Sequence, residues 1–172
     1  MDLRIAITDD LNSEREKLSS AIIAPFSKVG LNVGNIDEYT SGEELLRQFS
    51  AGRYDLIFLD IYMGGMSGIE TAKRIRALDK NVMLVFVTTS NEFASESYAV
   101  KANFYLLKPV RAESIRQLAE TVAQQLKNTG CAAALPDGTV IPLSSLVYTS
   151  CSGHYVNCLL YTSPSPRDRT RS

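Results

Sequence analysis

The 172-residue sequence has little of what many sites and folds depend on: three cysteines, one histidine and no tryptophan. Cys131, Cys151 and Cys158 are odd in number and form no C-x-x-C pair, and His154 stands alone, so neither a disulfide framework nor a zinc site is indicated. No uncharged apolar run reaches the ~18 residues of a transmembrane helix. The N-terminus also lacks the apolar stretch of a secretory signal, so we expect a cytoplasmic protein that makes no membrane contact.

An excess of charge of one sign is absent too. Lysine and arginine total 18 and aspartate and glutamate total 19, which gives a net charge of −1. This balance excludes a protein that captures its partner through bulk positive charge, such as a histone-like nucleic-acid coat. Between Gly130 and Pro166 only Asp137 is charged. A region of mixed charge therefore ends near Asn128, and a region almost without charge follows it.

The region before this boundary alternates between short apolar runs and helical periodicity, which predicts an α/β fold. The run at 55–60 is apolar without alternation, as expected of a central parallel strand that is buried on both faces. Five strands alternating with five helices predict a five-stranded parallel sheet, doubly wound and flavodoxin-like. The expected strands lie near 3–8, 33–39, 55–60, 82–87 and 104–107, and the expected helices near 13–26, 41–49, 69–78, 92–101 and 115–126.

Two short motifs predict where helices begin. Ser13-x-x-Glu16 and Ser41-x-x-Glu44 each have the form of a capping box, in which the serine accepts from a first-turn amide and the glutamate reaches back. Pro25 should kink the first helix or end it early.

Polar residues follow four of the five expected strands. Asp9 and Asp10 come after the first strand, Asp60 ends the third, Thr88 follows the fourth and Lys108 the fifth. Each alone has an ordinary structural explanation, such as a cap or a strand end, but the carboxyl ends of parallel strands meet at one edge. Three carboxylates there need a hard cation such as Mg²⁺, and an ammonium and a hydroxyl complete a pocket for a phosphoryl group.

At these positions the sequence resembles the receiver domains of two-component response regulators. The residues that carry the resemblance are Asp9, Asp10, Asp60, Thr88, Tyr105, Lys108 and Pro109. The segments Phe86–Thr88 and Tyr105–Val110 are similar to receivers that precede a LytTR-type (LytR/AlgR-like) DNA-binding domain. We therefore expect a receiver, or phosphoacceptor, domain over residues 1–128.

The resemblance implies a phosphorelay. Asp60 would be the nucleophile that accepts a phosphoryl group from a sensor histidine kinase, with Lys108 and Thr88 contacting the phosphoryl oxygens. Asp9, Asp10, Asp60 and the backbone carbonyl of Tyr62 would hold Mg²⁺.

The resemblance also implies a switch. Movement of Thr88 would let Tyr105 turn inward and repack the surface, and the Lys108–Pro109 bond would be cis. The chain would be no enzyme beyond its own phosphotransfer and slow dephosphorylation, and it would form a homodimer on phosphorylation.

The region after the boundary reads as β. Residues 135–143 predict two strands around an Asp137-Gly138 hairpin, and residues 129–160 resemble the start of a LytTR-type domain whose later, DNA-contacting segments have no counterpart. Residues 161–172 depart abruptly from that family and resemble translated sequencing-adapter sequence, so we expect a disordered or artefactual tail. Promoter DNA is a partner only if the second domain is complete.

Other functional classes are weaker. A haloacid-dehalogenase-like phosphatase needs a second carboxylate two residues after Asp60, where Tyr62 stands, and no P-loop string occurs. A flavodoxin-like flavin binder would have Asp9 and Asp10 where its phosphate must bind. The alternative that stays open is a stand-alone receiver that acts by protein–protein contact alone.

Overall fold

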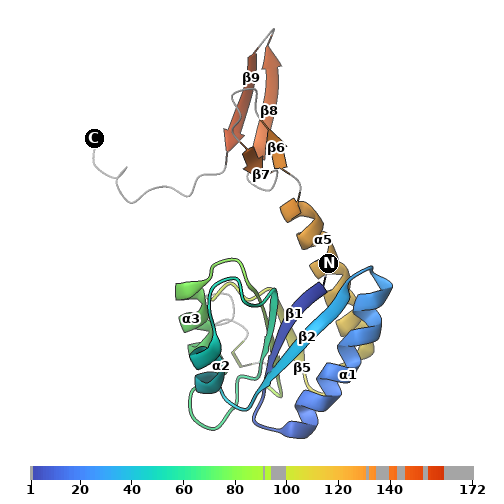
Figure 1. The fold of residues 1–172 in the computed structure, drawn as a ribbon, viewed down its shortest axis with the longest axis vertical. Helices are drawn as coiled ribbons and strands as arrows, with labels where there is room; N and C mark the ends of the chain where they lie inside the picture. The colour runs from blue at the N-terminus through green and yellow to red at the C-terminus, as the bar shows by residue number, and fades with distance from the viewer. Residues whose placement is uncertain are drawn as a thin grey trace, which may run out of the picture. The chain divides into compact units, whose positions relative to one another are not determined.

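The computed structural model describes residues 2–90, 92–93, 100–130, 132–134, 140–142, 146–152 and 155–160. Two compact units divide the chain within its last long helix, one over Met1–Ala123 and the other over Gln124–Ser172. Figure 1 shows the first unit as a sheet with helices on both sides and the second as short strands.

The first unit is built on one parallel sheet with the strand order β2-β1-β3-β4-β5. Its strands are β1 (Asp2–Thr8), β2 (Asn32–Tyr39), β3 (Leu56–Leu59), β4 (Met83–Thr88) and β5 (Phe104–Leu107). All residues of β3 and β4 are buried, because helices cover both faces of these central strands and their sequences are apolar throughout. The predicted doubly wound parallel α/β sheet is confirmed.

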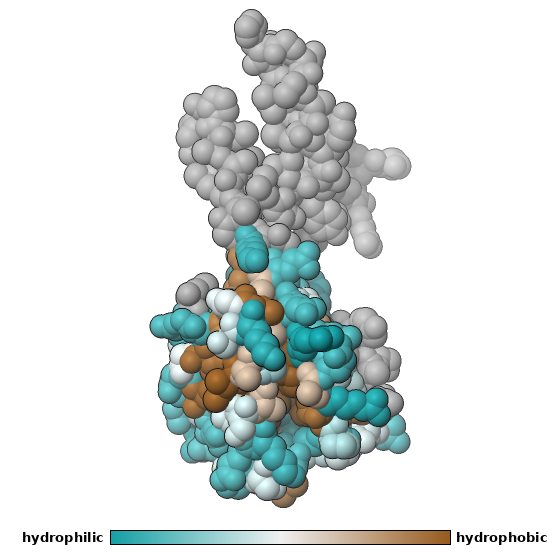
Figure 2. All heavy atoms as spheres, turned by 90° about the vertical axis from the view of Figure 1, so that its right-hand side faces the viewer, coloured by the Kyte–Doolittle hydropathy of each residue, from teal (hydrophilic) through white to brown (hydrophobic). Residues whose placement is uncertain are grey.

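Four helices are described around this sheet: α1 (Asn12–Lys28), α2 (Gly42–Gln48), α3 (Gly68–Leu78) and α5 (Ala112–Gly130). Figure 1 shows α1 and α5 on one side of the sheet and α2 and α3 on the other. Each helix turns an apolar stripe inward, as Ile22 and Phe26 do in α1 and Ile115 and Leu118 in α5, all of which are buried. On the face that carries α1, Figure 2 shows mainly hydrophilic side chains with smaller apolar areas between them.

The start of α1 differs from the prediction. The helix begins at Asn12, its N-cap Leu11 has no side-chain capping bond, and Ser13 and Glu16 lie within the helix. The capping box at Ser13 is therefore wrong. The physical reason is that the preceding turn at residues 9–12, which we call the acidic turn, orders the chain instead. A carboxylate oxygen of Asp9 accepts from the Leu11 amide, and the Asn12 side chain donates to Glu16.

The end of α1 also differs. The helix continues through Lys28, three residues past Pro25, so the expected early end at the proline is wrong. Phe26, which follows the proline, is fully buried, and this burial stabilises the last turn against the loss of one backbone hydrogen bond.

Serine side chains cap the N-termini of α2 and α3. The Ser41 hydroxyl accepts from the Glu44 amide, which confirms the serine half of the predicted box, while the Glu44 carboxylate accepts from the amide and hydroxyl of Thr40. Ser67 caps α3 in the same way by accepting from the Glu70 amide, a cap that the sequence reading passed over.

The expected helix at 92–101 falls largely outside the described residues, and its described ends, at 92–93 and 100–101, are turns.

In the second unit, β6 (Ala132–Ala134) pairs with β7 (Val140–Pro142), and β8 (Leu146–Ser152) pairs with β9 (Tyr155–Leu160), both antiparallel. The Asp137-Gly138 turn and residues 161–172 lie outside the described part. None of the described helices is long and apolar enough to cross a membrane.

Candidate functional site

The first site residues leave the carboxyl end of β1. The Asp9 amide donates to the Tyr39 carbonyl at the end of β2, so the turn starts in register with the neighbouring strand. Asp9 is buried, while Asp10, one residue further along the turn, is exposed. One carboxylate oxygen of Asp10 lies 3.4 Å from the Gly64 amide in the loop after β3.

Asp60 leaves the end of β3, the strand beside β1. Its amide donates to the Thr8 carbonyl at 2.9 Å, which brings the ends of the two strands together. One carboxylate oxygen accepts from the Tyr62 amide at 3.2 Å, and the side chain is buried. A Cβ on Gly68, the first residue of α3, would lie 2.1 Å from the Asp60 carbonyl, so the close approach of α3 to the site depends on a glycine there.

Thr88 and Lys108 leave the ends of β4 and β5. The Lys108 amide donates to the Thr88 carbonyl at 2.8 Å, and the Lys108–Pro109 bond is cis. The Lys108 ammonium lies 2.5 Å from Asp9 and 2.7 Å from Asp60, measured to one carboxylate oxygen of each, and its side chain is only 9% exposed. The structure thus brings residues that are 99 and 48 positions from Lys108 into direct contact.

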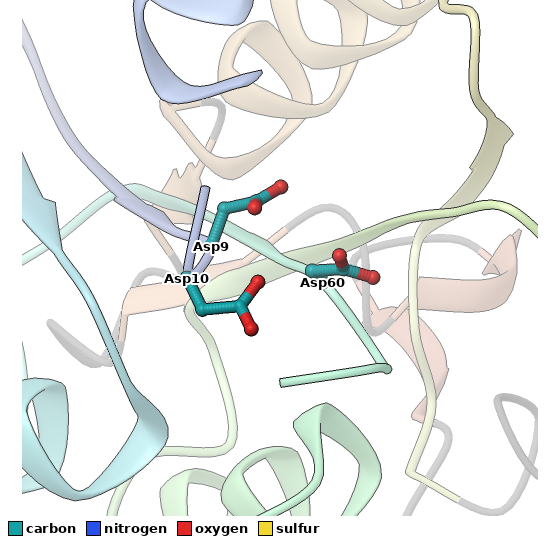
Figure 3. A group of neighbouring side chains, drawn as sticks. All are labelled: Asp9, Asp10 and Asp60. Atoms are coloured by element: carbon teal, nitrogen blue, oxygen red, sulfur yellow. The ribbon is translucent and has the colours of Figure 1, made fainter. Parts of the chain in front are cut away.

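The carboxylates of Asp9, Asp10 and Asp60 form one cluster, with an oxygen of each within 4.8 Å of the other two. Figure 3 shows the Asp9 and Asp10 side chains extending from the end of β1 toward the side on which Asp60 lies. Of the charges described here, one lysine faces three carboxylates, so a net negative charge is left at this edge of the sheet.

Burial and charge perturb the two central groups. Burial raises the pKa of the Asp60 carboxyl above its usual range, and the neighbouring Asp9 adds to this, although the ion pair with Lys108 acts in the opposite direction. Burial lowers the pKa of the Lys108 ammonium, but its hydrogen bonds and attraction to Asp60 and Asp9 outweigh burial and leave that pKa above its usual value. The lysine therefore stays charged between the two buried carboxylates.

The donor set fits a hard divalent cation. Mg²⁺ takes carboxylate and carbonyl oxygens, and three carboxylates within reach of one another supply more negative charge than Lys108 neutralises. The exposure of Asp10 leaves one side of the cluster open to solvent, from which an ion with its water molecules can enter.

The remaining predicted residues border the cluster. Thr88 is fully buried, yet its hydroxyl has no hydrogen-bond partner among the described residues, which is uncommon for a buried polar group. The half-buried Tyr105 donates its hydroxyl to the Ser90 carbonyl. Tyr62 is 45% exposed; its hydroxyl donates to Glu92 at 3.1 Å and its ring meets the edge of Phe93.

Arg15 is a site neighbour that the sequence reading missed. It lies in the first turn of α1, directly after the acidic turn, and is 8% exposed. Its guanidinium donates to the Asp9 carbonyl at 2.7 Å. A basic residue at position i+6 from an aspartate gives no local signal, because its contacts depend on how α1 packs beside β2. Gly68 is a second residue that the sequence did not single out, although its close approach to the Asp60 carbonyl makes it part of the site.

Comparison with known proteins decides the family. Residues 5–120 match the model of the response regulator receiver domain. The chain belongs to this family. The receiver has curated relatives with sensory and regulatory names: it is 36% identical over 100 residues to the sensory transduction protein LytR of Staphylococcus haemolyticus, covering 58% of this chain and 38% of that protein. It is 31% identical over 122 residues to the positive alginate biosynthesis regulatory protein of Pseudomonas aeruginosa, covering 67% and 45%.

These matches confirm the predicted receiver of LytR/AlgR type. The chain spans about half, or less, of the length of these curated relatives. Solved structures agree with the fold. The receiver domain of AraT from Geobacillus stearothermophilus is 28% identical, with a TM-score of 0.62 over 74% of this chain and 97% of that one. TrrA of Thermotoga maritima, solved with Mg²⁺ and a beryllium fluoride, is 31% identical, with a TM-score of 0.58 over 71% and 99%.

Proposed function

We propose that this receiver accepts a phosphoryl group on Asp60 from a histidine of a sensor kinase. The observation that carries the proposal is the buried Asp60 carboxylate, which lies in one cluster with Asp9 and Asp10 and in ion-pair contact with Lys108. An aspartate at the end of a buried parallel strand, with an ammonium against it, is suited to attack and then hold an anionic group.

In the proposed transfer, a carboxylate oxygen of Asp60 forms a bond to phosphorus while the bond from phosphorus to the kinase histidine breaks. The imidazole nitrogen keeps the electron pair of that bond and takes up a proton. Asp9, Asp10, Asp60 and the Tyr62 carbonyl would hold Mg²⁺, which supplies positive charge against the incoming phosphoryl oxygens. Lys108 contributes a second positive charge next to Asp60, already placed at 2.7 Å.

Thr88 and Tyr105 are proposed as the switch. The unpartnered Thr88 hydroxyl has a donor to offer a phosphoryl oxygen on Asp60, and satisfying it would draw Thr88 toward the site. Tyr105, which now donates to the Ser90 carbonyl, would turn inward into the space that Thr88 leaves. The surface around β5 would change as a result and favour homodimerisation.

The test of phosphorylation is labelling by acetyl phosphate, followed by mass spectrometry of the intact chain. We expect one added phosphoryl group in the presence of Mg²⁺ and none in chelator or after Asp60→Asn. Asp55→Asn is the matched control, because Asp55 precedes the same strand at its other end and lies outside the cluster. Labelling that survives Asp60→Asn, or that proceeds in chelator, contradicts the proposal.

The output is proposed from residues 129–160 as the start of a LytTR-type DNA-binding domain, which the antiparallel pairs of the second unit support. Most of the family's DNA-contacting segments are missing from these 172 residues, so we expect this chain to show no sequence-specific footprint on promoter DNA. Such a footprint would show that the second domain is complete enough to act. The alternative function is a receiver that acts by protein–protein contact alone.

The phosphorylated state is proposed to be long-lived. Tyr62 and Ser90 stand two residues past Asp60 and Thr88, where their side chains would flank the approach of water to phosphorus. The tyrosine side chain is large enough to crowd that approach, and a serine lacks the carboxamide that would place the water. Tyr62→Gly should therefore release phosphate several-fold faster in a malachite-green assay. An equal rate in parent and variant would contradict the shielding, and the contact of Tyr62 with Phe93 would then hold it away from the phosphoryl group.

A further inference from the structure

Arg15 makes an unusual set of contacts for a charged residue next to an acidic site. Its guanidinium donates to the Asp9 carbonyl at 2.7 Å and to the Asn12 side-chain oxygen at 2.7 Å, and it forms an ion pair with Glu38 at 3.3 Å. The side chain is 9% exposed. One buried group therefore ties both ends of the acidic turn, Asp9 and Asn12, to a carboxylate on β2.

Several other contacts of the turn that bears the two aspartates use the carboxylates themselves, since the Gly64 amide lies 3.4 Å from an Asp10 oxygen and the Lys108 ammonium lies 2.5 Å from an Asp9 oxygen. The Asp9 amide is held by the Tyr39 carbonyl, and the Leu11 amide is held by the Asp9 carboxylate itself. A cation that draws on that carboxylate competes with the Leu11 amide for its oxygens. The contacts of Arg15 do not compete, because they use the Asp9 carbonyl and the Asn12 side chain, so they can persist whether or not the cluster is loaded.

The contrast with Lys108 sharpens this point. Lys108 binds the carboxylates of Asp9 and Asp60 directly and so neutralises charge that a cation would otherwise meet. Arg15 is also cationic, but its described contact with Asp9 is to the backbone carbonyl and not to the carboxylate. It therefore orients the turn while leaving the carboxylate oxygens for another ligand.

We propose that Arg15 is a positioning residue of the cation site, which keeps Asp9 and Asp10 in place for a divalent cation before the cation arrives. This rests on the proposed function, in that the cluster is taken to bind Mg²⁺. Groups that hold metal ligands in place, without touching the metal, commonly change its affinity by about 10–100-fold when they are lost. The planar fork matters because each of its three nitrogens donates to a different acceptor, whereas the three donors of a lysine all leave a single nitrogen.

A second arginine provides a matched control. Arg53, in the loop before β3, likewise donates to one backbone carbonyl, that of Gln48 at 2.7 Å, and forms an ion pair with a β2 carboxylate, that of Asp37 at 3.2 Å. It takes no part in the acidic turn. Arg15→Lys and Arg53→Lys therefore make the same chemical change to two similar forks, of which one supports the cluster.

The experiment measures Mg²⁺ binding to the unphosphorylated chain by titration calorimetry, with thermal unfolding recorded for each variant. We expect Arg15→Lys to raise the Mg²⁺ dissociation constant by about tenfold and Arg53→Lys to leave it unchanged. The Arg53 side chain is more exposed, at 38% against 9%, so its substitution should lower Tm less. At saturating Mg²⁺, the rate of Asp60 labelling by acetyl phosphate should return to that of the parent chain. A structural defect alone would lower that rate at every Mg²⁺ concentration.

Equal dissociation constants for Arg15→Lys and the parent would overturn the proposal. If Arg15→Lys does not fold, Glu38→Gln is the second variant, because it retains the Arg15 side chain and removes only its ionic partner on β2. Several-fold weaker binding of Mg²⁺ by this variant supports the proposal, and unchanged binding overturns it. Failure of the proposed function is distinguishable, because the unmodified chain would then show neither Mg²⁺ binding nor labelling of Asp60, and this result would overturn both.

Discussion

The two ends of the parallel sheet carry similar residues in opposite arrangements. Asp55 lies just before β3, where its carboxylate binds the Arg4 guanidinium through two nitrogens and accepts from the Arg4 amide. Asp60 lies just after the same strand and shares one lysine with Asp9, while Asp10 lies nearby without a described basic partner. The amino end therefore matches its charges locally, and the carboxyl end does not.

The two aspartates differ in their titration for the same reason. Burial acts to raise the pKa of both carboxyls, but at Asp55 the hydrogen bonds from Arg4 outweigh it and hold that pKa below its usual value. At Asp60 burial prevails, and the pKa is raised. The comparison indicates that a strand end is made ready for a ligand by leaving its charges incompletely compensated, at a cost in stability that the rest of the fold offsets.

Removing the basic side chain from each end of the sheet should have the largest effect on stability and show the difference between the two ends most clearly. Lys108→Met would leave two buried carboxylates without compensation, so we expect the free energy of unfolding at neutral pH to fall by about 3 kcal/mol. Arg4→Met removes a side chain that is half exposed, and its loss should cost less than about 1 kcal/mol. Urea denaturation of both variants measures the difference, and equal losses would contradict the comparison.

Removing one carboxylate from the cluster and one from a matched ion pair on β2 should change stability in opposite directions. Asp10→Asn relieves repulsion in the cluster and should raise the free energy of unfolding of the Mg²⁺-free chain by about 0.5 kcal/mol at low salt. Asp37→Asn weakens the ion pair with Arg53 and the hydrogen bond from Tyr54, and should lower it by about 1 kcal/mol. Denaturation in chelator tests this pair, and added salt should shrink the Asp10 effect.

The smallest expected effect concerns acid stability. The lowered pKa of Asp55 contributes stability that is present above the ordinary aspartate pKa and is lost as the pH falls below it. The raised pKa of Asp60 acts oppositely: the native state takes up a proton first, so this group makes the protein more stable as the pH falls toward the ordinary value from above.

Unfolding free energies measured from neutral pH into the acid range separate these two contributions. Asp55→Asn should flatten the loss of stability below the ordinary aspartate pKa. Asp60→Asn should remove a gain above that pKa, so that the variant loses stability on acidification more steeply than the parent chain. The same change in both variants would mean that the two ends do not differ in their electrostatics.

Local sequence patterns predicted much of the first unit because they record burial directly. The unbroken apolar run of β3 predicted a central strand, and the serine at Ser41 predicted a helix start that the Glu44 amide confirms. The capping box at Ser13 failed, since the same pattern carries no information on whether a nearby turn already orders the helix start. Here the Asp9 carboxylate does so through the Leu11 amide.

The sequence by itself determined which residues stand at the ends of the strands, because each apolar run ends where a polar residue follows, and strand direction places those residues at one edge. Only the tertiary structure decided which of them touch. Three contacts show this. Lys108 forms ion pairs with both Asp9 and Asp60, and the Arg15 guanidinium donates to the Asp9 carbonyl. Gly68 lies close to the Asp60 carbonyl. Such contacts depend on strand register and helix packing, which no local pattern encodes.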